Sequence, residues 1–284
     1  MSRAQKVRAV LDAYGRKTFV PERADPTPEP QAAAPPTLAD QTPAPITLAD
    51  QAAAPFRSAA GAAGGASVDA AAHMLSDMFL SLTNGRATNV ASVTQAGDQV
   101  IDAIAEIGIA PWMDTVRAYH EGTFQHCLIV TGLTTLFGQK TGMRRRDVAL
   151  LTMVGLLHDI GKARIPLEIL DKQGPLTERE FAIIQSHPVI GYDYLLAQGG
   201  FPPSVLSAVR HHHEYLDGSG YPDGLSDAQI DDVTRILTIC DIYGALIEER
   251  AYKKPKTREE AIRILLEMGA EGKVETGLVQ AFAS

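Results

Sequence analysis

Helical periodicity runs through nearly the whole chain from residue 67 to the C-terminus. Apolar side chains recur there at spacings of three and four, and no segment alternates polar and apolar residues as a strand would. Glycine and proline interrupt the pattern, as at 199 to 203 and in DGSGYPDG at 217 to 224, so several helices are joined by turns. The sequence therefore predicts an all-α fold.

The first 66 residues have a different composition. Nine of the 17 prolines fall between Pro21 and Pro55, and the string TLADQ occurs twice. Such a segment cannot bury a core, so we expect residues 21–66 to form a disordered linker. Residues 1–20 carry five basic side chains, with apolar residues at helical spacing, which predicts a short helix that frays in solvent or docks on a protein partner. Helices over 67–110 are expected to pack on a larger helical domain at 111–284.

Charge and cysteine content exclude several classes of protein. Lys and Arg number 26 against 34 Asp and Glu, a formal charge of -8, which lacks the basic surplus of a protein that binds duplex nucleic acid. Two cysteines, Cys127 and Cys240, exclude a disulfide scaffold and suit a reducing compartment. No apolar run is long enough for a membrane span, and no secretory signal is visible, so a cytoplasmic location is expected.

Histidine is concentrated in one part of the chain, where seven of the eight lie between His120 and His213. One alone is more often a hydrogen-bonded core residue than a ligand. Five histidines on inward helix faces, together with two aspartates, call for another explanation. Burying an unpaired imidazole or carboxylate costs on the order of several kcal/mol of folding free energy. Shared cations would satisfy them. The predicted ligands are His126, His158, Asp159, His187, His212, His213 and Asp241, with Asp241 expected to be half-buried at the edge of its helix.

The type of ligand limits the choice of metal. Mixed imidazole and carboxylate ligands without a thiolate favour iron, manganese or another borderline divalent ion over structural zinc. His211 falls off the inward face and is expected to be a solvent or supporting residue. Glu214 follows the histidine pair, where it would either orient an imidazole or lie exposed at a helix end.

Several motifs carry a resemblance to a known family. They are HDIGK at 158 to 162, a spaced pattern from Ile169 through His187 to Gly191, HHE with DGSGYP between His212 and Leu225, and RIL with ICD at 235 to 241. Over about residues 110 to 268 the chain resembles the HD-GYP subgroup of the HD-domain phosphohydrolases.

The resemblance implies a fold, a reaction and a set of site residues. The fold is an HD-type helical bundle with additional C-terminal helices, and the reaction is hydrolysis of cyclic di-GMP, with linear pGpG or GMP as the end product. Two divalent metals, iron or manganese, would hold a bridging hydroxide that attacks phosphorus in line. By motif position the catalytic residues are Asp159, suited to bridging, and Lys162, and the substrate-binding residues are Lys162, Gly220, Tyr221, Pro222, Arg250 and Lys253.

Two positions depart from the family pattern. Gly122 stands where some members have a glutamate that holds a third metal, and Glu121 is out of register by one, so two metals are expected rather than three. Gly244 stands where the family usually has a second aspartate on the last ligand helix. Without that aspartate, a carboxylate that could support the metal ligands is missing. A lower rate of hydrolysis or a weaker affinity for metal is then expected.

Three other functions fit the same motifs. The protein could be a catalytically weak or inactive adaptor that binds cyclic di-GMP, a phosphohydrolase for another nucleotide or cyclic dinucleotide, or a di-iron redox protein. Trp112 and the helices before it are expected to cover the core of the HD domain, and they are candidates for a homodimer interface.

Overall fold

The computed structural model describes residues 65–117, 122–249 and 254–284, and over these ranges it contains helices and no strand. The predicted all-α class is therefore confirmed. The predictions for residues 1–64 lie outside the described residues. The helices are α3 (Gly65–Thr83), α4 (Val90–Ile107), α5 (Ile109–Arg117), α6 (Gly122–Lys140), α7 (Arg145–Leu157), the 3-10 helix η1 (Ile160–Arg164), α8 (Leu167–Leu170), α9 (Glu178–Ile184), α10 (His187–Gln198), α11 (Pro203–His211), the 3-10 helix η2 (Asp227–Gln229), α12 (Asp232–Ile247), α13 (Arg258–Ala270) and α14 (Thr276–Ala283).

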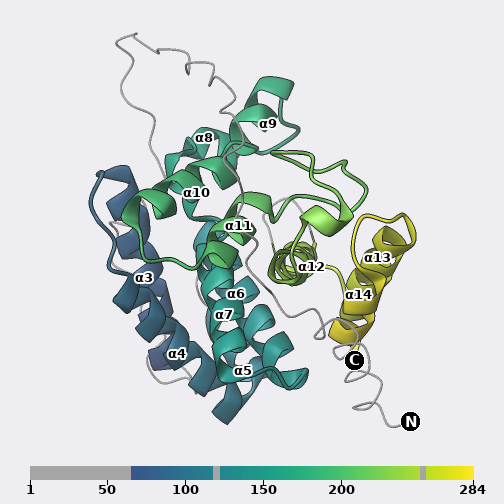
Figure 1. Cartoon of the computed structure of the whole chain (residues 1–284), viewed down its shortest axis with the longest axis horizontal. Coiled ribbons are helices and arrows are strands. Elements are labelled where there is room, and N and C mark those ends of the chain that lie inside the picture. The colour runs from purple at the N-terminus through teal and green to yellow at the C-terminus, as the bar shows by residue number, and fades with distance from the viewer. Residues whose placement is uncertain (1–64, 118–121, 250–253) are drawn as a thin grey trace. The chain divides into compact units, whose positions relative to one another are not determined.

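Helices α3 and α4 form a hairpin that packs on α6, α7 and η1 (Figure 1). The pair was expected from residue 67, and the structure begins it at Gly65. The Asn89 side chain caps α4 by accepting the Ala91 N–H. At the tip of the hairpin the Leu82 carbonyl accepts a hydrogen bond from Arg164 at the end of η1. The hairpin thus braces the segment that carries HDIGK.

Helices α6 and α7 lie side by side along the middle of the bundle (Figure 1). They approach closely at Gly155, where an added Cβ would lie 2.7 Å from the Cα of Thr131. Buried threonine hydroxyls along the contact bond to carbonyls or to one another, as Thr135 does with Thr152. The Trp112 indole of α5 is fully buried and donates to the Leu128 carbonyl, which fixes α5 on α6. The site is therefore built on rigid helices.

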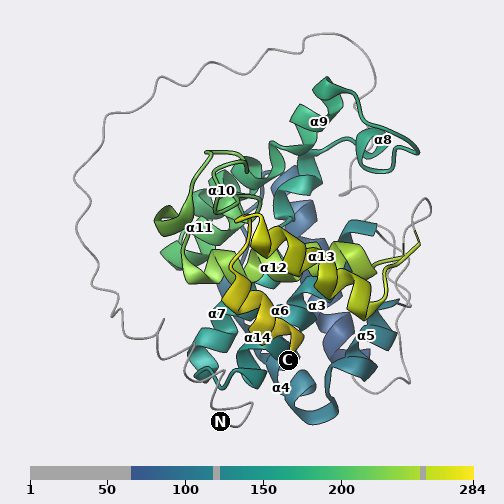
Figure 2. The ribbon, with the colours of Figure 1, turned by 90° about the vertical axis from the view of Figure 1, so that its right-hand side faces the viewer.

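The chain after residue 176 forms two helices that are separated at residues 185 and 186. Thr177 and Glu180 form a capping box, α9 ends at Ile184, and α10 begins at His187 with Pro188 in its first turn. His187 therefore stands at the start of a helix and not at the end of one. Phe181, an apolar residue of α9 whose spacing from Ile184 suggests an inward face, is instead 48% exposed. The reason is that α9 packs mainly on the short α8 and has no core behind it, and both ribbon views show it at the periphery (Figure 2).

The C-terminal helices α13 and α14 pack on one another and on α12 (Figures 1 and 2). Arg235 of α12, only 12% exposed, bonds to Glu275 before α14 and to the Asp227 carbonyl. These bonds fasten the chain's C-terminal part to the helix that carries Asp241. Separately, α3 and α4 line a cavity of about 580 Å³ that none of the predicted site residues borders.

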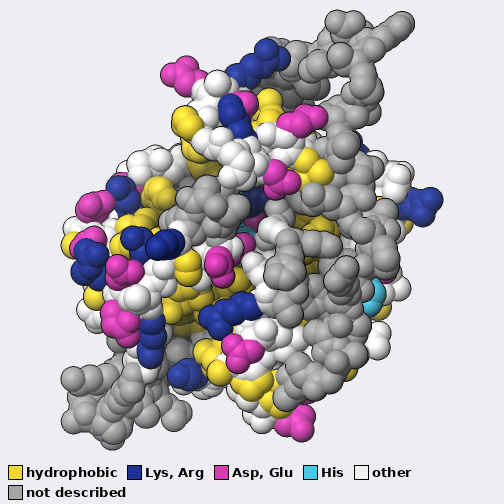
Figure 3. Space-filling model, turned by 180° about the vertical axis from the view of Figure 1, so that it is seen from behind, with side chains coloured by type: hydrophobic (Ala, Val, Ile, Leu, Met, Phe, Trp, Pro, Cys, Tyr) yellow, Lys and Arg dark blue, Asp and Glu magenta, His cyan; other side chains and the backbone are white. Residues whose placement is uncertain are grey.

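On the face seen from behind, basic and acidic side chains of the described residues are interspersed and form no patch of one sign (Figure 3). Among the described helices, none combines the length and the apolar character that a membrane crossing requires.

Candidate metal centre

The seven predicted ligands come from five separate segments and meet in one place. His126 lies on α6, His158 directly after α7, His187 at the start of α10 and Asp241 within α12. Six of the seven side chains are buried, and only His213, with 24% exposure, reaches solvent. Two groups have ligand atoms close enough to hold a metal ion, and Asp159 belongs to both: Asp159 with His187, His212 and His213, and Asp159 with His126 and His158. Their role as ligands stays a prediction.

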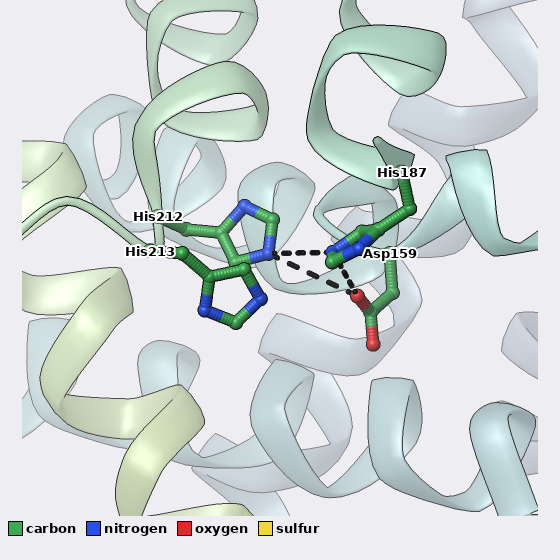
Figure 4. A group of neighbouring side chains, drawn as sticks. All are labelled: Asp159, His187, His212 and His213. Atoms are coloured by element: carbon green, nitrogen blue, oxygen red, sulfur yellow. Dashed lines mark hydrogen bonds and ion pairs between the residues drawn. The ribbon is translucent and has the colours of Figure 1, made fainter. Parts of the chain in front are cut away.

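The Asp159 carboxylate stands between the two groups of histidines. Its Oδ1 lies 3.1 Å from His187 Nε2 and 3.8 Å from His212 Nε2 (Figure 4). Its Oδ2 lies 3.4 Å from His158 Nε2 and 3.9 Å from His126 Nε2. One carboxylate that presents each oxygen to a different set of imidazoles has the arrangement needed to bridge two cations.

Three of the imidazoles are oriented by backbone carbonyls. The Nδ1 atoms of His158, His187 and His212 lie 2.9, 2.6 and 2.9 Å from the carbonyl oxygen three residues earlier in each case. An N–H donated from Nδ1 leaves the Nε2 lone pair available, so each ring presents Nε2 as a ligand atom. Local helix geometry alone sets this orientation.

His126 lies between two carboxylates. Its Nε2 is 2.8 Å from Asp241 Oδ1, and its Nδ1 is 3.3 Å from Oε2 of Glu248. Asp241 was expected to be half-buried, but it is 7% exposed, because α12 packs on both α6 and α11. Glu248 was not predicted as a site residue. Its position relative to Asp241 could have indicated it. Glu248 follows Asp241 by seven residues, which is about two helical turns, so both residues lie on the same face of the helix.

Burial and charge act against each other in this cluster. Burial lowers the pKa of His187 and of His212, and it lowers the pKa of His213 to about 3, so these rings are neutral at pH 7. Burial also opposes charge on His126, but the hydrogen bond to Asp241 and the nearby carboxylate of Glu248 outweigh that effect and raise the pKa of His126 to about 9. Burial would raise the pKa of Asp159, but Lys162 and His158 hold it well below its usual range.

The donor set fits a pair of divalent cations. His158 Nε2 and Asp159 Oδ1 are buried and have no hydrogen-bond partner among the described residues. Buried polar atoms without partners are costly in a native fold, and both atoms point into the cluster. The neutral rings of His187, His212 and His213 beside the ionised Asp159 carboxylate are in the ligand states that iron and manganese need.

Lys162 lies at the rim of the cluster. It is the last residue of HDIGK, and its Nζ donates to Asp159 Oδ2 at 2.5 Å, with 19% of the side chain exposed. Burial disfavours its charge, but Asp159 outweighs that effect and raises the pKa of Lys162, which therefore stays protonated. A fixed cation with one side toward solvent can contact an anionic substrate.

The GYP residues pack against the histidine pair. The Tyr221 ring stacks on His213 with centroids 4.8 Å apart, and the Tyr221 N–H donates to the His213 carbonyl. An added Cβ on Gly220 would lie 2.4 Å from the Cα of Glu214, so only glycine fits there. Pro222 is partly exposed. Gly220 and Tyr221 thus have packing roles, and contact with substrate stays a prediction for all three residues.

Two residues beside the histidine pair hold this loop in place. Glu214 is 2% exposed and accepts the N–H groups of residues 223, 224 and 225. It neither orients an imidazole nor lies exposed, so both expectations for it are wrong. His211 points away from the cluster and contacts Asp223 at 2.9 Å, which agrees with a supporting residue.

Some predicted site residues lie outside the described part of the chain. They are Arg250 and Lys253, for which substrate contact was expected, and Glu121. Gly244 is described, and an added Cβ there would lie 3.1 Å from Val130 Cγ2 and 3.7 Å from His126 Cε1. The position therefore faces the predicted ligand, as its place in the motif implies.

The chain is similar to proteins that are named as phosphodiesterases of cyclic dinucleotides. At 33% identity the chain matches a cyclic di-GMP phosphodiesterase of Pseudomonas aeruginosa, over 67% of this chain and 46% of that protein. At 38% identity it matches 3'3'-cGAMP-specific phosphodiesterase 1 of Vibrio cholerae, over 54% of this chain and 35% of that protein. The chain thus spans about half or less of the length of these relatives.

A solved structure shares the fold. It is an HDG"Y"P protein from Bdellovibrio bacteriovorus, with a TM-score of 0.61 and 20% identity, covering 79% of this chain and 72% of that one. The family model described as HD domain matches residues 110–276, a range that contains all seven clustered side chains. Because that match covers more than half of the sequence, the chain belongs to the HD domain family, as its resemblance to the HD-domain phosphohydrolases implied.

Proposed function

We propose that this protein is a metal-dependent phosphodiesterase that hydrolyses cyclic di-GMP to linear pGpG and then to GMP. The observation that carries the proposal is the Asp159 carboxylate, whose two oxygens face two different groups of histidines. Relatives named as cyclic di-GMP phosphodiesterases support the choice of substrate.

The proposed metal ligands fall into two sets that share Asp159. One ion would be held by His126, His158, Asp159 and Asp241, and the other by Asp159, His187, His212 and His213. Such ions, when bound, supply Lewis acidity that activates water and neutralises phosphoryl oxygens.

The remaining site residues bind and orient. Lys162 keeps its proton and lies at the solvent edge of the cluster, so it can donate to a nonbridging phosphate oxygen and offset charge there. Tyr221 holds the partly exposed His213 ring by stacking on it. The substrate contacts proposed for Arg250 and Lys253 rest on motif position alone.

The test is turnover by the purified protein with bound manganese or iron. Cyclic di-GMP is incubated with the protein and with an Asp159→Ala variant, and the products are separated by chromatography. The proposal requires pGpG or GMP to form with the parent protein and not with the variant. Equal turnover by the two would contradict it, and tight binding without hydrolysis would favour the adaptor.

A second candidate substrate is 3'3'-cGAMP. It is favoured by the match at 38% identity to a phosphodiesterase named as specific for this dinucleotide. The two cyclic dinucleotides should be compared in the same assay by their kcat/KM values, since that ratio measures discrimination between substrates. A higher value for 3'3'-cGAMP would reassign the substrate and keep the proposed chemistry.

The proposed homodimer and the proposed protein partner of the N-terminal segment are independent of the chemistry. Sedimentation of the purified protein tests the first, and loss of partner binding on removal of residues 1–20 tests the second.

A further inference from the structure

His126 differs from the other three buried histidines in how its Nδ1 atom is accommodated. His158, His187 and His212 each direct Nδ1 at the backbone carbonyl three residues earlier in the chain. The Nδ1 of His126 has no hydrogen-bonded partner among the described residues, and Oε2 of Glu248 lies 3.3 Å from it. The ring of His126 therefore depends on a side chain from another helix.

The opposite ring atom of His126 faces the cluster. Its Nε2 lies 2.8 Å from Asp241 and 3.9 Å from Asp159. If Nε2 binds a metal, the ring's proton must reside on Nδ1, and a buried N–H needs an acceptor. Glu248 is 3% exposed and stands on that side of the ring. Its distance of 3.3 Å is within ion-pair reach, and a small ring rotation would turn the contact into a hydrogen bond.

The surroundings explain how Glu248 reaches the ring. Glu248 ends α12, one turn after Gly244, and its N–H donates to the Gly244 carbonyl. With no side chain at Gly244, α12 approaches α6 so closely that an added Cβ would lie 3.1 Å from Val130. This close approach brings the Glu248 carboxylate beside His126 across the contact between the two helices.

We propose that Glu248 is a positioning residue for the metal centre: its carboxylate accepts the Nδ1–H of His126, fixes the ring with Nε2 toward the metal, and strengthens that ligand. A carboxylate behind a ligating imidazole fixes its tautomer and raises its basicity, and its loss typically costs 10- to 100-fold in metal affinity. The carboxylate acts on one metal site, because His126 belongs to only one of the two ligand sets. The inference rests on the proposed function, since it presumes that the cluster binds metal.

The test counts metal ions and measures their affinities. Free Mn²⁺ is followed by electron paramagnetic resonance while it is added to metal-free parent protein, to Glu248→Gln, and to Glu249→Gln. Gln keeps the volume and removes the charge. Glu249 is the exposed neighbour, so its variant loses the same charge at the surface. The expected result is two Mn²⁺ sites in all three proteins, with about 10- to 100-fold weaker binding at one site in Glu248→Gln alone.

A second variant pair separates this role from a merely structural one. In a His126→Ala background, Glu248→Gln should weaken Mn²⁺ binding no further, because the residue through which Glu248 acts is gone. Unchanged affinities in Glu248→Gln, equal weakening of both sites, or an undiminished effect in the His126→Ala background would each overturn the inference. A parent protein that binds no Mn²⁺ would instead overturn the proposed function, and the inference with it.

Discussion

At Gly161 the backbone of η1 passes directly against the start of α10. An added Cβ would lie 2.0 Å from the His187 carbonyl oxygen and 2.7 Å from the Gly191 nitrogen. Both neighbours are backbone atoms, so neither can rotate away. The glycine of HDIGK is therefore a steric requirement that lets Asp159 and His187 meet.

The first prediction follows from this contact. Gly161→Ala should lower the free energy of unfolding by about 3 kcal/mol or more, because one buried methyl group must push two backbone segments apart. Chemical denaturation monitored by circular dichroism measures the change. The control is Gly97→Ala on α4, where the nearest atom would be Thr152 Cγ2 at 3.7 Å. There the substitution should be neutral or stabilise by about 0.5 to 1 kcal/mol, and similar losses in both variants would refute the steric explanation.

Some residues of the site could be predicted from the sequence, and others could not. His126, His158 and Asp159 could be named from the sequence because each sits on or directly after an apolar helical stripe, a local property. Glu248 and Glu214 could not, since their burial depends on which distant segment packs over them.

Among the elements, α9 depends on polar contacts more than on a core. Glu180 accepts hydrogen bonds from Lys172 and from Thr177, and no residue of α9 is buried. Hydrogen bonding from Lys172, followed by that from Thr177, lowers the pKa of Glu180 to about 2. The helix is therefore held at its first turn by a carboxylate that must be ionised.

The second prediction is the pH dependence of this contact. The pKa in the folded state is below the ordinary value of 4.5, so the stability contributed by Glu180 is present above that pH and is lost as pH falls toward about 2. With a metal chelator present, the parent protein should have a higher Tm than the Glu180→Gln variant at pH 7. The difference between the two Tm values should become smaller below pH 4.5. Glu178→Gln, an exposed change on the same helix, is the control, and a gap that does not vary with pH would count against the ion pair.

The loop that follows the histidine pair is organised around one buried carboxylate. The three backbone N–H groups that Glu214 accepts come from residues 223–225, immediately after GYP. An ionised acceptor is required for all three, because an amide would bring an NH₂ group against a backbone N–H.

The third prediction is therefore that Glu214→Gln destabilises the protein by about 1.5 to 3 kcal/mol, the range for a hydrogen bond to a charged group. Limited proteolysis should also cut the variant faster within 217–225. The exposed Glu106 on α4 offers the matched control, Glu106→Gln, which should change neither quantity. Equal proteolysis of the two variants would show that Glu214 does not hold the loop.

At the scale of the whole molecule, the seven predicted metal ligands bring together segments of the chain between α6 and α12. Elsewhere these segments are joined through contacts between pairs of helices. Because the predicted ligands come from five segments, a cation bound there would link all five of them. A ligand that binds only the folded state stabilises it by RT ln(1 + [L]/Kd), about 2.7 kcal/mol at a concentration of 100 Kd.

The fourth prediction is that Mn²⁺ raises the Tm of the metal-free protein and that a chelator reverses the rise. Differential scanning calorimetry with increasing Mn²⁺ should follow the logarithmic dependence just given. In Asp159→Asn the rise should be lost or much reduced, since the carboxylate common to both sets is neutralised. A full rise in that variant would mean that the metal binds elsewhere.

The sequence by itself determined the helices, their breaks and the inward side chains of the seven clustered residues, because periodicity, capping boxes and proline positions act within a few residues of one chain segment. It also determined the family, through the spacing of HDIGK and the GYP string. Only the tertiary structure decided that Asp159 faces two histidine sets, that Glu248 stands behind His126, that Glu214 holds a loop and that Phe181 is exposed. Each of these depends on which segments pack together, and burial and pairing between distant segments are not encoded in any local pattern.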